Sequence, residues 1–162
     1  MAKLKSTLKV FNADDLKGKE GHGKGHVQKV LVGNDERPSE RLRASLNTFE
    51  PGTYIPLHWH PIEGIYCCIA GRAILKDVEG KSYEIVPPKF IYISPGIACA
   101  HEWEVKEKLQ LIAVRATTSP EKNIQFTVDK TNMRSYIEFD YLVEQAGASF
   151  KSFKMARPAM QQ

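Results

Sequence analysis

Short runs rich in β-branched, aromatic and other apolar residues, interrupted by Gly, Pro and Asn/Asp, dominate the chain from about residue 26 to residue 116. Breaks such as Pro51-Gly52 and Pro95-Gly96 join a residue that fixes φ to one that tolerates positive φ, which a reversing chain requires. Many short strands with such turns between them are typical of a sandwich or a small barrel, so we expect an all-β domain. The expected strands span residues 26–32, 42–49, 64–70, 73–77, 83–86, 90–94, 102–105 and 109–115.

The length of the chain favours one domain with two flanking segments. At 162 residues, the chain can bury a substantial core but has the size of a single ordinary domain. We expect a barrel over 26–116, a flexible, glycine-rich N-terminal arm over 1–25, and a C-terminal appendage over 117–162 that packs on the barrel or on a partner subunit. Within the appendage, apolar periodicity predicts a strand at 124–128 and a helix over 136–146.

Composition and charge narrow the classes of function. The 23 Lys and Arg residues exceed the 19 Asp and Glu residues by four and are spread along the chain, so nucleic-acid binding finds little support. No apolar run approaches the ~20 residues of a membrane span, and the N-terminus lacks the apolar stretch of a signal peptide. Three cysteines, two of them adjacent, do not suit a disulfide framework. We therefore expect a soluble, cytoplasmic protein with free thiols.

The histidines predict a metal site. His58 and His60 stand at i and i+2 on an expected strand, so both imidazoles point to the same side. His101 follows a second strand-and-turn pattern further along the chain. Imidazole nitrogens are common ligands of transition metals, and these three histidines invite a single site. His22 and His26 lie in or beside the glycine-rich arm, where ordering the chain would cost too much for a preformed site.

The same stretch resembles the cupin superfamily, whose motifs are G-x5-H-x-H-x(3,4)-E-x6-G and G-x5-P-x-G-x2-H-x3-N. The matching positions are Gly52, His58, His60 and Gly71 in the first motif, and 83–88, 90–96 and the nearby His101 in the second. The resemblance covers roughly residues 42–116. It implies a jelly-roll barrel, the cupin double-stranded β-helix, with a divalent transition metal (iron, manganese, zinc, nickel or copper) in its mouth. It also implies a homodimer, because small cupins commonly pair through exposed sheet edges.

The position of the fourth metal ligand departs from the family pattern. Counting back seven residues from Gly71, the slot of the family's Glu or Gln holds Gly64, and the nearest carboxylate is Glu63, one residue earlier. A shift of one residue turns a strand side chain to the other face, so Glu63 reaches the metal only if the strand begins after it or a bulge re-aims it. Some cupins do have H-x2-E. Glu63 is therefore either a metal ligand and acid–base residue or a solvated acid of the turn.

The second motif departs in a similar way. Counting from Pro88 puts Cys99 where the family's histidine usually stands, and His101 comes two residues later. In an extended strand these two residues share a face, so either or both could reach the metal. We favour His101, because a slightly longer turn costs little and imidazole suits more metals than thiolate does. Cys99 is otherwise a soft ligand, a reactive thiol or a small buried hydrophobe.

Strand parity suggests further side chains in the barrel interior. Tyr66 shares the phase of Gly64 and is expected inside, either as a hydrogen-bond donor or acid toward a substrate or as a core residue. Trp59, between the two histidines, is expected on the opposite face, in a packing or interface surface. Arg43 and Arg115 lie on flanking strands and are expected to face solvent; if either faces inward, a carboxylate substrate is implied, since a buried guanidinium needs an anion.

Three functional hypotheses follow from these residues. The first is a metal-dependent enzyme of the isomerase, lyase or dioxygenase type that acts on a small polar or carboxylated metabolite. The second is a non-catalytic small-molecule binder or sensor with a degenerate metal site, because Gly64 and Cys99 stand at ligand positions. The third is a structural accessory protein with a dry barrel. We favour the enzyme because the paired histidines are intact, although the fold alone does not choose among the three.

Overall fold

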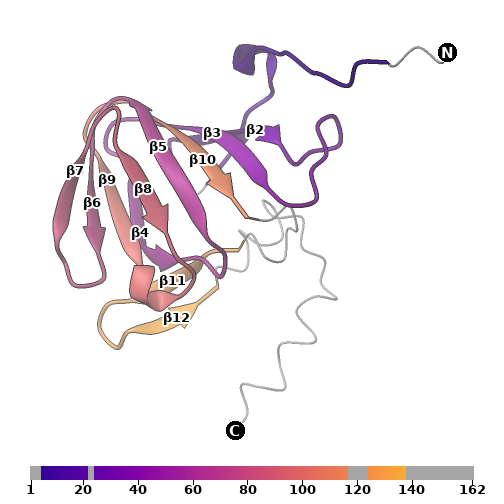
Figure 1. Cartoon of the computed structure of the whole chain (residues 1–162). Coiled ribbons are helices and arrows are strands. Elements are labelled where there is room, and N and C mark those ends of the chain that lie inside the picture. The colour runs from indigo at the N-terminus through magenta and orange to yellow at the C-terminus, as the bar shows by residue number, and fades with distance from the viewer. Residues whose placement is uncertain (1–4, 22–23, 117–123, 138–162) are drawn as a thin grey trace, which may run out of the picture.

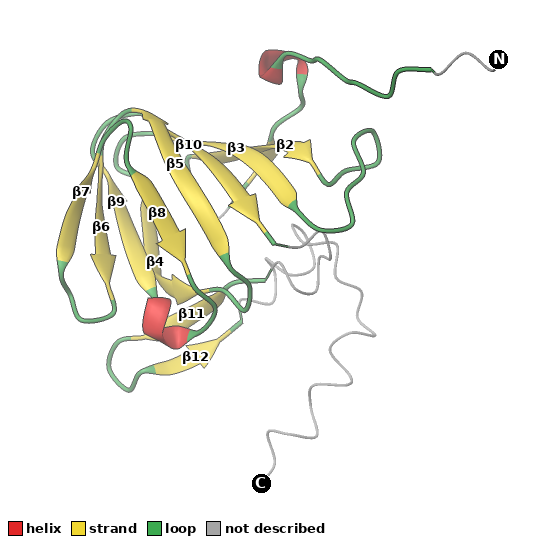
Figure 2. Ribbon diagram, in the orientation of Figure 1, coloured by secondary structure: helices red, strands yellow, loops and turns green. Residues whose placement is uncertain are grey.

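The structure, a computed structural model, describes residues 5–21, 24–116 and 124–137 (Figure 1). Two antiparallel sheets of six strands each face one another and enclose the core. The strand orders are β1-β2-β3-β10-β5-β8 and β12-β11-β4-β9-β6-β7. Apart from two short 3₁₀ turns, every regular element in these residues is a strand (Figure 2). The prediction of an all-β jelly-roll barrel is therefore confirmed.

The strands follow the predicted runs closely. The first sheet contains β1 (Lys19–Glu20), β2 (His26–Val32), β3 (Arg43–Phe49), β5 (Gly64–Ala70), β8 (Phe90–Ile93) and β10 (Leu109–Arg115). The second sheet contains β4 (Tyr54–Trp59), β6 (Ala73–Asp77), β7 (Ser82–Ile85), β9 (His101–Val105), β11 (Phe126–Asp129) and β12 (Arg134–Tyr136). The 3₁₀ turns are η1 (Ala13–Asp15) and η2 (Ile97–Cys99). The sequence did not predict β1 or β12, both of which are short and exposed.

The interior changes character along the strands. Alternate residues of a strand face the space between the sheets, and on β10 this row runs from Leu109 and Leu111 to Arg115. Leu109 and Leu111 belong to the main apolar core, where Leu109 has no exposed surface. Arg115 lies at the other end of the same row, where β10 stops. One end of the barrel is therefore closed by apolar packing, and the other end is a polar mouth.

A β-bulge in β4 determines which residues of that strand face the interior. Ile55 lies opposite Trp103 of β9, whereas His58 lies opposite His101, so three steps along β4 match two along β9. The extra residue lets Ile55 and His58 both face inward although they are three positions apart, a spacing that would put them on opposite faces of a regular strand. Pro56 lies inside this irregular stretch, and a residue without an N–H is tolerated where the ladder is interrupted.

The second sheet continues beyond residue 116. β11 pairs with β4, with Thr127 opposite His58, and β12 pairs with β11. The predicted strand at 124–128 is thus present with slightly shifted bounds, whereas the predicted helix over 136–146 lies outside the described residues apart from its first two positions. The division into 1–25, 26–116 and 117–162 stays a prediction. None of the helices in the described ranges has the length and apolarity to cross a membrane.

Candidate metal centre

Three histidines from two neighbouring strands meet at the polar mouth. His58 and His60 come from the end of β4 and the residue directly after it, and His101 opens β9. All three are buried, with exposed fractions of 3%, 2% and 4%. One potential ligand atom from each ring lies within 4.8 Å of those from the other two. The cross-strand register explains the contact, because His58 and His101 are direct partners in the ladder.

Backbone carbonyls determine which ring nitrogens carry the hydrogens. The Nδ1 atom of His58 lies 2.8 Å from the carbonyl oxygen of Pro56, that of His60 lies 3.1 Å from Ile124, and that of His101 lies 2.9 Å from Cys99. A carbonyl oxygen only accepts hydrogen bonds, so each Nδ1 must donate. In a neutral imidazole the proton on Nδ1 leaves the lone pair on Nε2 free to bind a metal.

The electrostatic environment favours the neutral form of two of these rings. Burial lowers the pKa of His60 well below its ordinary value of 6.5, and the nearby Arg115, His58 and His101 lower it further. Burial also lowers the pKa of His101 to about 4; the hydrogen bond to the carbonyl of Cys99 opposes this shift, and Arg115 adds to it. Both imidazoles are therefore neutral near pH 7, the state in which histidine binds a metal.

One polar atom in the cluster suggests that the site is built for a ligand. The Nε2 atom of His101 is buried and has no hydrogen-bond partner within the described residues. A buried polar atom without a partner loses its interaction with water and gains nothing in return. A metal ion bound to the three Nε2 atoms would remove this deficit. The donor set of three neutral imidazoles suits zinc, copper, iron and nickel.

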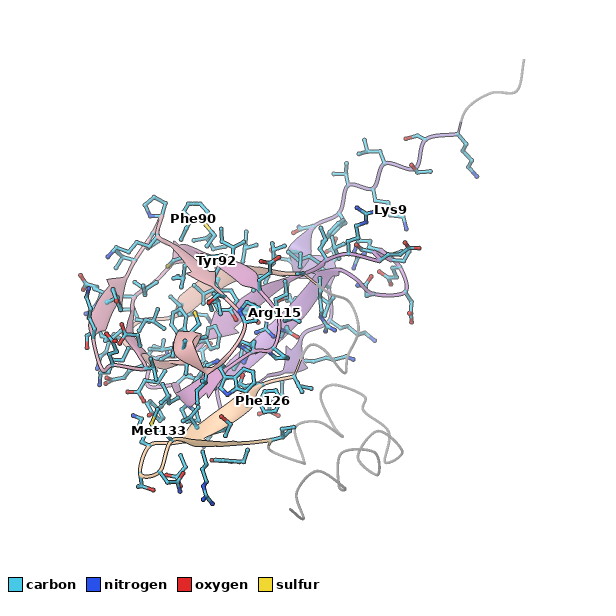
Figure 3. The ribbon with its side chains drawn as sticks, turned by 60° about the horizontal axis from the view of Figure 1, so that its bottom comes forward. Lys9, Phe90, Tyr92, Arg115, Phe126 and Met133 are labelled. Atoms are coloured by element: carbon cyan, nitrogen blue, oxygen red, sulfur yellow. The ribbon has the colours of Figure 1, made fainter. Side chains whose placement is uncertain are left out.

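The side chain of Arg115 lies beside Gly64, the position at which the family motif has its carboxylate ligand. Gly64 of β5 is the direct partner of Arg115 of β10, and a Cβ atom at Gly64 would come within 3.3 Å of Cγ of Arg115 and 3.1 Å of the carbonyl oxygen of Val114. Nη2 of Arg115 donates a hydrogen bond to the hydroxyl of Tyr66 at 2.8 Å and lies 3.3 Å from Nε2 of His60. Figure 3 shows Arg115 among the strands near the mouth. The missing side chain at Gly64 therefore gives Arg115 room to reach the histidines.

The histidine cluster lies between two hollows. A small polar cavity of about 60 Å³ contacts His58, Tyr66 and Arg115 and continues to the side chains of β2 and β3. A larger and mostly apolar groove of about 430 Å³ lies between β8 and the β6–β7 hairpin and contacts His101. A ligand could approach the cluster from either side, but only the small cavity also touches the guanidinium and the tyrosine hydroxyl.

The structure places the other two predicted ligands outside this cluster. Glu63 is exposed in the turn before β5, where its carboxylate accepts a hydrogen bond from the hydroxyl of Tyr92 at 3.3 Å. Cys99 is half-buried at the end of η2 and packs against the apolar core. The strand begins only at His101, so the shared strand face assumed for Cys99 and His101 does not form. The roles of Glu63 and Cys99 as ligands, and of Glu63 and Tyr66 in catalysis, stay predictions.

The outward side of the same strands makes stacking, hydrogen-bonding and ionic contacts within the second sheet. Trp59 stacks on Phe126 with ring centroids 4.2 Å apart, and its Nε1 donates to the hydroxyl of Ser135 at 2.8 Å. The expected outward position of Trp59 is thus confirmed. Glu102, next to His101, accepts a hydrogen bond from the hydroxyl of Tyr54 at 2.7 Å and forms an ion pair with Lys130.

Sequence reasoning missed a group of polar side chains in the small cavity. Asn47 of β3 accepts hydrogen bonds from Nε2 of His26 at 3.0 Å and from the side-chain amide of Gln28 at 3.1 Å, and it donates to Ser45. His26 was discounted because it borders the glycine-rich arm, yet it is buried and stacks on Phe49. In β3, buried Ser45, Asn47 and Phe49 alternate with half-buried neighbours, so strand parity counted back from Phe49 could have placed this row inside the barrel.

Comparisons with known proteins agree with the fold. The sequence-family model of the cupin domain matches residues 45–115. No functionally curated protein matches the chain. The polyketide cyclase RemF from Streptomyces resistomycificus is similar in structure, with a TM-score of 0.65, 19% identity, and coverage of 86% of this chain and 96% of that one.

Two further solved structures show the same likeness. A sugar phosphate isomerase of the cupin superfamily from Silicibacter pomeroyi has a TM-score of 0.60, 17% identity, and coverage of 80% of this chain and 93% of that one. An RmlC-like cupin from Shewanella frigidimarina has a TM-score of 0.56, 15% identity, and coverage of 68% and 92%. At such low identities the likeness is one of fold, and the two proteins with a named activity, a cyclase and an isomerase, differ in that activity.

Proposed function

Residues 45–115 form a cupin domain, and on that premise we propose that this protein binds one divalent transition metal through His58, His60 and His101 and acts as a metal-dependent enzyme. The observation that carries the proposal is the arrangement of the three rings. Each Nδ1 is engaged by a backbone carbonyl, and Nε2 of His101 is buried without a hydrogen-bond partner. This arrangement prepares three lone pairs for one ion.

The proposed reaction is of the isomerase, lyase or dioxygenase type on a small polar or carboxylated metabolite. The metal would supply a Lewis acid for a carbonyl or carboxylate oxygen of the ligand, or a site for dioxygen if it is iron. Tyr66 accepts a hydrogen bond from Arg115, so its own hydroxyl hydrogen can be donated into the small cavity. Tyr66 and Arg115 would thus orient an oxygen of the ligand, and the apolar core below them excludes water from that end of the barrel.

A second candidate function is a non-catalytic binder or sensor. Within the described residues, the histidine cluster contains no carboxylate that could act as a general acid or base. The groove of about 430 Å³ has a volume typical of small-molecule sites and an apolar lining, which a binder could use without chemistry. Binding of a small molecule without turnover would favour this candidate.

Metal content tests the proposal. Untagged wild-type protein should contain close to one transition metal per chain by plasma mass spectrometry, after anaerobic reconstitution if necessary, whereas His58→Ala and His101→Ala should contain almost none. His26→Gln is the matched control, because it removes a buried histidine outside the cluster and should retain the metal. A wild-type protein that takes up none of iron, manganese, nickel, copper and zinc would contradict the metal site.

The assembly and location of the protein remain proposals as well. We propose that the protein is cytoplasmic and that it forms a homodimer, because each sheet of the described residues ends in edge strands that pairing between two copies would cover. Light scattering coupled to size-exclusion chromatography measures the oligomeric state directly. A monomer at micromolar concentration would contradict the dimer without affecting the metal site.

A further inference from the structure

We propose that the ligand bound beside the metal is an anion, and that Arg115, in the space left by Gly64, is the residue that selects its negative charge. This inference rests on the proposed metal site and specifies the class of ligand that the site accepts. In the family motif, the slot at Gly64 supplies a carboxylate that partly neutralises the metal. Here that slot carries no side chain, Cγ of Arg115 on the neighbouring strand lies beside it, and the guanidinium of Arg115 reaches His60 and Tyr66.

The contacts of Arg115 connect it to the metal site. Its Nη2 lies 3.3 Å from Nε2 of His60, the nitrogen that remains free for a metal. A metal that takes this lone pair removes the acceptor, and the N–H then points toward whatever binds next to His60. A carboxylate oxygen is the strongest acceptor for such a group, because both partners are charged and the guanidinium can offer two parallel N–H groups.

The charge balance of the mouth also favours an anion. Imidazoles that bind a metal are neutral, so a divalent ion and Arg115 together would place three positive charges in a largely buried site. Arg43 lies nearby, because it is the direct partner of Arg115 on β3 and lies in register with the inward-facing Ser45 and Asn47. Within the described residues the histidine cluster contains no carboxylate, so an anionic ligand would offset the positive charge at the metal directly.

The size of the cavity fits one small anionic group. The cavity contacted by Arg115, Tyr66 and His58 has a volume of about 60 Å³, which is space for roughly two water molecules at ~30 Å³ each. A carboxylate group fills such a space, whereas a whole sugar or aromatic acid does not. Tyr66 can donate its hydroxyl hydrogen to the same group, since its oxygen already accepts from Arg115.

Binding of acetate and acetamide to the cobalt(II)-loaded protein tests this inference, with visible absorption of cobalt and calorimetry as readouts. These two probes have nearly the same shape but differ in charge. Wild-type protein should bind acetate at least tenfold more tightly than acetamide, and Arg115→Gln should weaken acetate binding by roughly tenfold or more, the effect of one charge-assisted hydrogen bond. The same variant should bind cobalt more tightly, because a repelling charge is gone.

These opposite changes separate the inference from simple damage to the fold, which would weaken both cobalt and acetate binding. Gly64→Ala should weaken acetate binding in the same direction while keeping the arginine, since the added methyl presses on Cγ of Arg115. Arg72→Gln is the control, because Arg72 pairs with Glu84 and Glu107 at the other end of β5 and should change neither affinity. Equal acetate affinity in wild type and Arg115→Gln, or equal binding of acetate and acetamide, would overturn the inference.

A metal-free arm distinguishes this inference from the proposed function. If the wild-type protein takes up no cobalt, acetate binding to the metal-free protein is measured by the line width of the acetate NMR signal. Acetate binding that depends on Arg115 would then support the anion site, even though the proposed metal-dependent function would be contradicted. Absence of Arg115-dependent acetate binding in both the metal-free and the cobalt-loaded protein would refute the anion site.

Discussion

The two faces of β4 and β9 differ in how far their polar groups are satisfied. On the outer face, Trp59 and Glu102 have stacking, hydrogen-bonding and ionic partners within the chain. On the inner face, the nitrogen lone pairs of His58, His60 and His101 converge, and Nε2 of His101 has no hydrogen-bond partner within the described residues. Residues adjacent in sequence thus serve opposite purposes, because strand side chains alternate. The outer face holds neighbouring strands of the second sheet together, whereas the inner face is left incomplete for a ligand.

Substitutions on the two faces should differ most in the free energy of unfolding that is gained when metal is added. A metal at 1,000 times its Kd should raise the free energy of unfolding of the wild type by about 4 kcal/mol, since it binds only the folded state. His60→Ala should lose this increase, whereas Trp59→Ala should keep it. Thermal or urea unfolding with and without metal measures both. An increase that survives in His60→Ala would show that the metal binds elsewhere.

The metal-free inner face should be sensitive to acid. The unfolded chain protonates His101 near pH 6.5, whereas the folded chain resists until about pH 4, so stability is present above pH 6.5 and declines as the pH falls toward 4. The loss attributable to His101 is on the order of 3 kcal/mol. Urea unfolding at several pH values measures it. His101→Gln, which cannot titrate, should show a flatter profile, and an unchanged profile would assign the acid sensitivity to another group.

The outer face should respond to loss of packing instead. Trp59→Ala removes the stack on Phe126 and the hydrogen bond to Ser135, and we expect a loss of about 2 kcal/mol in the free energy of unfolding. The number of metal ions per chain should not change. Trp59→Phe retains a ring and should recover part of the loss. If Trp59→Ala left the stability unchanged but removed the metal, the separation between the two faces would be wrong.

Among these substitutions, Glu102→Gln should change the free energy of unfolding least. Burial alone would raise the pKa of its carboxyl, but Lys130 and Tyr54 hold the pKa below its ordinary value of 4.5. Its contribution is therefore present above pH 4.5 and is lost as the pH falls below that value, a lower window than that of His101. Glu102→Gln should cost roughly 1 kcal/mol, because its partner Lys130 is largely exposed. Urea unfolding at several pH values should show this difference between wild type and Glu102→Gln above pH 4.5 and its loss below that value. A difference that already disappears above pH 5 would contradict the assignment.

The sequence predicted which histidines lie on the inner face, but it did not predict how strand pairing orients the residues around them. Alternation identified His58 and His60 as a pair and Trp59 as outward, because that rule depends only on position in a strand. It did not predict that Ile55 would share their side, since the bulge is a property of how β4 pairs with β9. Pro56 was the available signal, because proline in a strand often marks such an irregularity.

Arg115 shows a second limit of sequence reasoning. The expectation that Arg115 faces solvent was wrong: its guanidinium contacts Tyr66 and His60, and parity along β10 could not be related to the histidines without knowing that Gly64 is its partner on β5. The glycine itself was interpreted as a missing ligand. In the structure it is also the space through which the arginine reaches the site, a relation between strands that are distant in sequence.

The bulge in β4 makes the site depend on how the strands pair as well as on chemistry. A chain of the same length that paired as a regular ladder beyond Ile55 would turn every later side chain of β4 to the opposite face. Trp59 would then enter the barrel and both histidines would leave it, with no change in any of these side chains. Deleting one residue between Ile55 and His58 would instead remove the bulge and keep His58 opposite His101, so in the evolution of such a barrel the extra residue can be lost without loss of the metal ligands.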